Sequence, residues 1–248
     1  MIAVEGLAHR FGDVSVIDHL DLKVPEGCFA SLVGPSGCGK STLLRILAGL
    51  LAPTRGDARI GSRSVVNAPG NVAYMPQRDL LLPWRRALGN ATVGAEIAGV
   101  ERDEARRRAI ALFERFGLAG FERAWPAQLS GGMRQRLALL RTFLIGRDIL
   151  LLDEPFGALD AITRRDMHVW LQQVLATDPR TVLLVTHDVE EALVLSDVVV
   201  VLSDRPARIV EQMPVAMPRP RTLDAVSGDD FVTAKSKLLR ALEAGRDR

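Results

Sequence analysis

Short runs of apolar residues alternate along the chain with longer segments whose apolar residues recur every three or four positions. Runs of the first kind predict strands, and segments of the second kind predict helices. Strands are expected at residues 2–8, 28–34, 72–77, 148–155, 181–188 and 196–203, and helices at residues 39–51, 161–176 and 188–195. Because apolar strands alternate with helices along most of the chain, we expect an α/β fold with a largely parallel sheet.

Two segments depart from this alternation. Residues 83–147 contain no strand-like run, and "ERDEARRRAIALFERFG" within them repeats its apolar positions near helical spacing, so we expect an inserted helical subdomain. From residue 216 the chain is rich in Pro and Arg, and residues 216–248 are expected to form a weakly held C-terminal tail with one short helix. The main domain would then cover residues 1–215.

Composition removes several classes of protein from consideration. The chain has 248 residues, of which 48% are hydrophobic, which is enough for one large domain with a substantial core. Its formal net charge of +2 argues against a dedicated nucleic-acid binder. Two cysteines, Cys28 and Cys38, fit a reducing cytosol. We expect no signal peptide, and no apolar stretch approaches the ~18 residues of a spanning helix, so contact with a membrane would go through a partner.

The stretch "GPSGCGKST" at residues 34–42 has the spacing of a phosphate-binding loop, with an expected strand before it and an expected helix after it. Its glycines let backbone amides wrap phosphates, Lys40 would reach the β- and γ-phosphates, and the Ser41 hydroxyl would bind Mg²⁺. A tight strand–helix turn would account for the glycines but not for the Lys-Ser pair. No separate chemistry is assigned to the Cys38 thiol. The residues expected to hold the nucleotide are Gly34, Pro35, Ser36, Gly37, Cys38, Gly39, Lys40, Ser41 and Thr42.

Polar side chains also follow three other apolar runs, where parallel sheets bind their ligands. They are Gln77, the adjacent pair Asp153 and Glu154, and His187. Taken singly, each has an ordinary structural reading: a solvated loop residue, a helix cap and a core histidine. Together with the phosphate loop their roles interlock. Asp153 would hold Mg²⁺, Glu154 would polarise the attacking water, Gln77 would bridge metal and water, and His187 would contact the γ-phosphate.

A second anion-binding pattern lies about ninety residues further on, in "QLSGGMRQR" at residues 128–136. Ser130, Gly131 and Gly132 precede an amphipathic run, so backbone amides at the start of the expected helix would point outward with a partial positive charge. One chain therefore carries two helix starts suited to phosphate.

The ordered series "GPSGCGKST", Gln77, "LSGGM", "ILLLDEP", "GALD" and His187 resembles the ATP-binding cassette family over about residues 1–215. The resemblance implies a phosphate-loop NTPase core with helices on its parallel sheet, an N-terminal antiparallel β part and the inserted helical subdomain. It also implies that two chains pair head to tail. The "LSGGM" helix start of one chain then caps the γ-phosphate of ATP held by the other, and Asp160 in "GALD" crosses the interface.

Further assignments come from the same resemblance. Phe11 matches the family's aromatic that stacks on adenine, with a core or turn aromatic as the alternative. The stretch "LLPW" after Gln77, with "FGALDAITR", resembles the branch of importers for nitrate, alkanesulfonates, taurine and thiamine-precursor pyrimidines. In importers the groove beside this stretch receives a permease helix; alternatively, Leu80–Leu82 and Trp84 only pack the helical insertion.

The implied protein is an ATP-hydrolysing importer subunit on the cytoplasmic face of the cell membrane, with ATP and Mg²⁺ as cofactors. Its partners would be a second cassette, a transmembrane permease and a solute-binding protein. A soluble cassette such as an iron–sulfur assembly ATPase is the alternative. Polar neighbours place His9, His19 and His168 on the surface, and Arg164–Arg165 on a solvated helix face.

Overall fold

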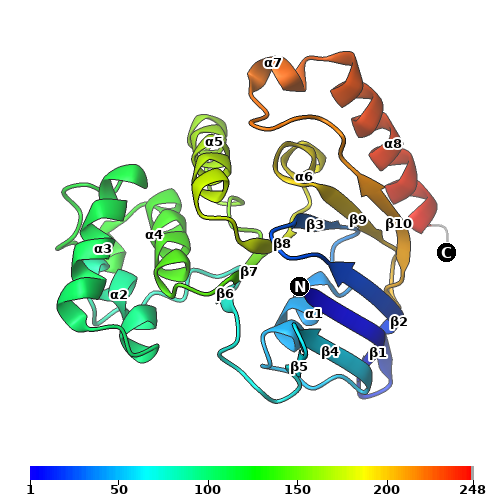
Figure 1. Cartoon of the computed structure of the whole chain (residues 1–248), viewed down its shortest axis with the longest axis horizontal. Coiled ribbons are helices and arrows are strands. Elements are labelled where there is room, and N and C mark those ends of the chain that lie inside the picture. The colour runs from blue at the N-terminus through cyan, green and yellow to red at the C-terminus, as the bar shows by residue number, and fades with distance from the viewer. Residues whose placement is uncertain (247–248) are drawn as a thin grey trace.

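The centre of the molecule is a six-stranded sheet in a computed structural model that describes residues 1–246 (Figure 1). The spatial order of its strands is β10-β9-β3-β8-β7-β6, and all neighbours are parallel except β10 and β9. This arrangement confirms the expected α/β class. The strands are β3 (Phe29–Val33), β6 (Ala73–Met75), β7 (Ile149–Asp153), β8 (Thr181–Val185), β9 (Val198–Leu202) and β10 (Ile209–Pro214).

A smaller antiparallel sheet with the order β2-β1-β4-β5 forms the N-terminal part, as the family resemblance implies. The Ala207 amide donates to the Val16 carbonyl, and the Asp18 amide donates to the Ala207 carbonyl. These two bonds attach the antiparallel sheet to the loop between β9 and β10. Its strands are β1 (Ile2–Phe11), β2 (Val14–Val24), β4 (Arg55–Ile60) and β5 (Arg63–Ser64).

Consecutive residues of the central strands face two different apolar cores. In β7, Leu150 and Leu152 belong to the core under the helices, whereas Ile149 and Leu151 belong to the core shared with α1 and the antiparallel sheet. Side chains of a strand point alternately to its two sides. An uninterrupted apolar run is therefore what a strand covered on both faces requires.

Helices cover the central sheet and extend beyond its β6 edge. Figure 1 shows α2, α3 and α4 gathered on one side (green), α8 on the opposite side (red), and α5 and α6 between them. The helices are α1 (Lys40–Leu47), α2 (Ala87–Ile97), α3 (Arg102–Arg115), α4 (Gly131–Leu144), α5 (Ala161–Thr177), α6 (Val189–Leu195), α7 (Leu223–Val226) and α8 (Asp229–Arg246), with a 3₁₀ turn at Pro126–Gln128.

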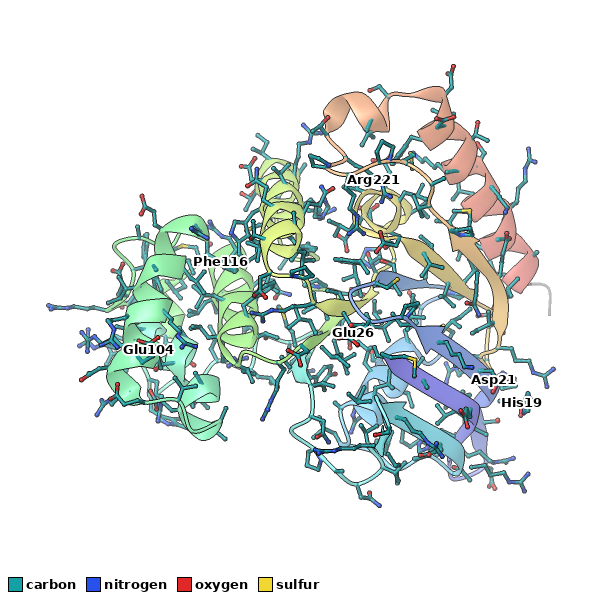
Figure 2. All side chains as sticks on the ribbon, in the orientation of Figure 1. His19, Asp21, Glu26, Glu104, Phe116 and Arg221 are labelled. Atoms are coloured by element: carbon teal, nitrogen blue, oxygen red, sulfur yellow. The ribbon has the colours of Figure 1, made fainter. Side chains whose placement is uncertain are left out.

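An aromatic cluster joins the helical group to the rest of the molecule. The ring of Phe116, labelled in Figure 2, lies 4.2 Å from that of Trp170 on α5, and Phe143 of α4 packs edge-on against both. Such edge-to-face contacts add to ordinary apolar burial. The 83–147 segment is thus anchored to α5 as well as through its two chain connections.

The helix expected in the C-terminal segment is present as α8, but the segment is not the weakly held tail that its composition predicts. α8 has 18 residues and buries Phe231 and Leu238 against the central sheet and α6. Ahead of it, the buried guanidinium of Arg221 donates to the carbonyls of Leu193 and Ser196 near the end of α6, and Figure 2 shows it beside that helix. Composition misled here because the apolar residues of α8 lie on one face of a helix that is otherwise polar.

Within residues 1–246 no helix is both long enough and apolar enough to cross a membrane.

Candidate functional site

The phosphate-type loop lies between β3 and α1, as its flanking pattern predicts. Gly39 caps the start of α1 with a φ of 124°, and a Cβ there would lie 2.9 Å from Val16 Cγ1 in β2. Only glycine suits both constraints. The buried Lys40 ammonium donates to the carbonyl oxygens of Gly34 and Pro35, each at 2.8 Å. The loop therefore curls around its own lysine, with the first amides of α1 at its base.

The strand β7, which is separated from β3 by β8, brings a carboxylate to the same place. The Ser41 hydroxyl donates to Asp153 Oδ1 at 3.1 Å, although the two residues are 112 positions apart. Burial raises the pKa of the Asp153 carboxyl, and the hydrogen bond from Ser41 opposes that rise. A hydroxyl and a carboxylate in contact are the donor types that Mg²⁺ takes from a protein when phosphates complete its shell. Among the described residues, no cluster of three or more His, Cys, Asp or Glu side chains could hold a metal by itself.

Three predicted residues converge on one carboxylate at the ends of neighbouring strands. Gln77 Nε2 donates to Glu154 Oε2 at 3.2 Å, and His187 Nδ1 lies 3.3 Å from the same oxygen. The Glu154 backbone has a φ of 49°, in the left-handed region that a residue with a side chain rarely adopts. The turn after β7 thus aims the carboxylate at the space beside Gln77 and His187.

Sequence reasoning missed one residue of this group. Gln135 of α4 is buried and donates through Nε2 to the Glu154 carbonyl at 3.2 Å. It holds the strained turn in place from the side of the "LSGGM" helix. In the sequence, Gln135 is only a polar residue on the inward face of an amphipathic run. Such a residue is common in helices and does not by itself indicate a functional site.

The second helix start points outward. Ser130 caps α4 by accepting a hydrogen bond from the Met133 amide at 3.2 Å, and Ser130 and Gly131 are exposed. A Cβ on Gly132 would lie 3.3 Å from Leu159 Cδ2, so this turn lies beside the "GALD" turn. Figure 1 shows α4 with the helical group, and α1 beside the antiparallel sheet. The structure brings Asp153 into contact with the phosphate loop, whereas Ser130 and Gly131 stand at the start of α4 in the helical group.

Asp160 and Phe11 also occupy exposed turns. The Asp160 carboxylate caps α5 by accepting from the amides of Ile162 at 3.1 Å and Thr163 at 3.0 Å, and these bonds lower its pKa. Phe11 ends β1 with 47% of its surface exposed, and its ring lies edge-on to that of His9 at 4.5 Å. It pairs with Val14 at the start of β2, the strand that packs on the phosphate loop. Phe11 is therefore not a core aromatic.

Two side chains expected on the surface lie inside the protein instead, and a third is half-buried. His9 is buried, the side chain of His168 is only 12% exposed, and Arg164 is half-buried in contacts between helices. Polar neighbours in sequence do not decide exposure, because alternate positions of a strand or helix face opposite ways. His19 is exposed, as expected.

A strand, a glycine-rich loop ending in Lys-Ser, and an acid at the end of another parallel strand of the same sheet define a phosphate-loop nucleoside triphosphatase. The family model for ABC transporter proteins matches residues 17–157, more than half of the chain. The chain belongs to this family, and it is an ATPase that binds and hydrolyses ATP.

Relatives extend the match over nearly the whole chain. The aliphatic sulfonates import ATP-binding protein SsuB 1 of Rhodococcus jostii is 51% identical over 87% of this chain and 84% of its own length. The SsuB protein of Rhodopseudomonas palustris is 43% identical over 98% of this chain and 84% of its own. A solved dimeric ATP-binding cassette in a post-hydrolysis state with ADP and Pi superposes with a TM-score of 0.79, at 26% identity, over 88% of this chain and 100% of that one.

Proposed function

We propose that this ATPase is the energy-supplying subunit of an importer for aliphatic sulfonates. The observation that carries the substrate class is the identity of 43–51% with relatives named as sulfonate import ATP-binding proteins, over most of each chain. The branch that imports nitrate, taurine or thiamine-precursor pyrimidines shares the "LLPW" and "FGALDAITR" stretches, so these solutes are the nearest competitors.

For catalysis we propose the roles that the strand-end geometry supports. Lys40 and the loop amides hold the phosphates, while Ser41, Asp153 and Gln77 bind Mg²⁺, which neutralises phosphate charge and orients the γ-phosphate. Glu154 accepts a proton from the attacking water, and His187 contacts the γ-phosphate. Because a proton and Mg²⁺ compete for the Asp153 carboxylate, its raised pKa should weaken Mg²⁺ binding as the pH falls.

We propose that the second helix start completes a site on another copy of this chain. Ser130 and Gly131 are exposed, Gly132 lies beside the turn that ends at Asp160, and α4 belongs to the helical group, apart from α1. A head-to-tail pair would bring these groups against ATP held by the partner and would use both copies of each motif. Similarity to a solved dimeric cassette supports this assembly.

The permease partner is proposed to dock on the helical group. Leu80 and Trp84, 58% and 71% exposed, do not pack the insertion, whereas Leu81 does. Next to them is a cavity of about 1000 Å³ lined in part by Arg85, Leu88 and Glu96. A cavity of this size suits a short helix from a membrane protein. The ATPase would then lie on the cytoplasmic face of the cell membrane, and a solute-binding protein would deliver the sulfonate outside.

The proposed division of the chain follows these roles. Residues 1–215 would form the ATPase domain, with residues 83–147 as the inserted subdomain that carries the permease groove. Residues 216–248, of which the structure describes 216–246, would form a C-terminal segment that packs on this domain.

The proposal is tested by sulfonate uptake in cells that lack this gene. Plasmid-borne wild type should restore uptake of labelled ethanesulfonate, and the Glu154→Gln chain should not. Uptake of nitrate or taurine in place of sulfonate would redirect the substrate class. Purification of the tagged chain from membranes should recover a hydrophobic permease; recovery of a soluble scaffold instead would favour iron–sulfur assembly.

A further inference from the structure

Polar side chains of α5 contact the start of α6 and the segment around Arg221, and both helices begin at proposed nucleotide contacts. α5 starts directly after Asp160, and α6 starts directly after Asp188, the neighbour of His187. The polar residues of α5 are spaced four apart and so share one face of the helix. Their contacts are Arg164 Nη1 to Asp188 Oδ2 at 3.4 Å, His168 Nε2 to Glu191 Oε2 at 3.4 Å, and Gln172 Oε1 accepting from the Arg221 amide at 2.8 Å.

These contacts are a costly way to pack two helices. Within residues 1–246, Arg164 Nε and Glu191 Oε1 are buried without a hydrogen-bond partner. Leaving such groups unpaired opposes folding, and buried ion pairs are often no more stabilising than apolar residues of the same size. What polar pairs do provide is a fixed alignment between the groups they join. The interface therefore points to positioning rather than to stability.

Arg164 joins the two functional turns directly. Its Nη2 donates to the Leu159 carbonyl at 3.0 Å, in the turn that ends at Asp160, while Nη1 reaches Asp188. The other carboxylate oxygen of Asp188 accepts from the Glu190 amide at 2.9 Å, in the first turn of α6. One guanidinium thus spans from the "GALD" turn to the start of the helix that follows His187.

The same arginine borders the space beside the catalytic carboxylate. Arg164, His187 and Glu154 line a small cleft of about 10 Å³. His187 is itself 64% exposed and meets Glu154 through one contact at 3.3 Å, so its own packing does little to fix it. Its position depends on the turn that holds it, and Arg164 is a main attachment of that turn to the rest of the site.

We propose that Arg164 is a positioning residue for ATP hydrolysis, which holds the Leu159–Asp160 and His187–Asp188 turns at a fixed separation so that His187 stays aligned beside Glu154. The inference rests on the proposed role of His187 at the γ-phosphate. Its consequence is specific: loss of Arg164 should slow hydrolysis without weakening the binding of ATP, because the phosphate loop is left intact.

The test measures kcat and KM for ATP on the purified full chain. Arg164→Ala should lower kcat at least about tenfold with KM within about twofold of wild type. Arg164→Lys should stay defective, since an ammonium lacks the planar fork that reaches both turns. The matched control is Arg165→Ala, because Arg165 is exposed and its side chain makes no hydrogen bond or ion pair with another described residue; it should stay within about twofold.

Asp188→Asn tests the link from its other end while the helix start is kept, since asparagine caps helices as well as aspartate does. It should reproduce the kcat loss. The kcat of the Arg164→Ala, Asp188→Asn double variant should lie within about twofold of that of the less active single variant. If the Arg164→Ala chain fails to fold, the Asp188→Asn variant alone still tests the inference. The inference would be overturned if the kcat loss of the double variant equalled the product of the two single losses. A kcat for Arg164→Ala equal to that of Arg165→Ala would overturn it as well. His187→Ala separates the two proposals: if it hydrolyses ATP normally, the proposed role of His187 is wrong.

Discussion

Single residues matter most where separate parts of the chain meet at one atom, and Glu154 is such a place. Gln77 from the β6 end and His187 from the β8 end both contact its Oε2, while Gln135 of α4 holds its carbonyl. The left-handed backbone of Glu154 costs on the order of 1–3 kcal/mol and persists because these neighbours fix it. Strain of this kind is typical of a residue placed for chemistry.

Replacing Glu154 by Gln keeps the shape and most hydrogen bonds but removes the charge that accepts a proton. Turnover should fall by a factor on the order of 100 or more, with ATP affinity retained. Size-exclusion chromatography with ATP and Mg²⁺ should show the variant mostly as a dimer and the wild type mostly as a monomer. Hydrolysis at the wild-type rate would remove Glu154 from the mechanism.

Lys40→Ala should act on binding itself. The ammonium sits inside the loop on the Gly34 and Pro35 carbonyls, and it is the one side-chain cation we assign to the phosphates. Its loss should weaken ATP affinity at least about tenfold, which corresponds to ~1.4 kcal/mol. Calorimetric titration with ATP measures this, with Lys235→Ala on α8 as a control. A Kd within about twofold of wild type contradicts the assignment.

Among the elements, α1 and α4 carry the two proposed phosphate contacts, and they lie in different parts of the fold. A helix start binds an anion only within its first turn. The α4 start lies apart from the loop of its own chain, which is why we propose that it serves a phosphate held by a second chain.

Ser130→Arg tests that arrangement. A bulky cation at the exposed cap of α4 should block closure, so turnover should fall on the order of 100-fold or more while ATP affinity changes by less than about twofold. Mixing Ser130→Arg chains with Lys40→Ala chains gives head-to-tail dimers with one doubly defective site and one intact site. Some activity should return.

A mixture as inactive as its parts has two explanations that dimer formation separates. If ATP still induces mixed dimers, both sites must work together. If no mixed dimer forms under conditions where Glu154→Gln dimerises, the composite site is wrong.

For the molecule as a whole, the C-terminal segment belongs to the same folded body as the sheet. α8 lies against β9, β10 and α6, and Arg221 fastens the preceding stretch to the end of α6. Burial lowers the pKa of the Arg221 guanidinium to about 10, and it remains charged at neutral pH. Cutting the segment away would expose the apolar face that it covers.

Leu238→Ala measures how much this packing contributes. Leu238 is fully buried, and truncating a buried leucine costs about 2–5 kcal/mol. The neighbouring Leu239 is 44% exposed, so Leu239→Ala is a matched control that should cost less than about 1 kcal/mol. Urea unfolding followed by circular dichroism compares the two. Equal midpoints for the two variants would show that α8 is loosely held after all.

Some strands and the phosphate loop could be predicted because the residue patterns that mark them span only a few positions. Long apolar runs such as residues 149–152 mark strands covered on both sides, and the spacing of glycines around Lys40 marks a phosphate loop. β10 and α8 were not foreseen as parts of the sheet and its cover. Their apolar residues occupy one face only, and Pro and Arg nearby suggested a tail.

The sequence by itself determined the class of fold, the phosphate loop and the polar residues at the strand ends, because each depends on neighbours within a few positions. Only the tertiary structure decided that Gln135 contacts Glu154, that Arg164 spans two turns and that α4 lies with the helical group, apart from α1. These relations join residues from 5 to about 90 positions apart. Chain packing sets such distances, and local pattern carries no information about them.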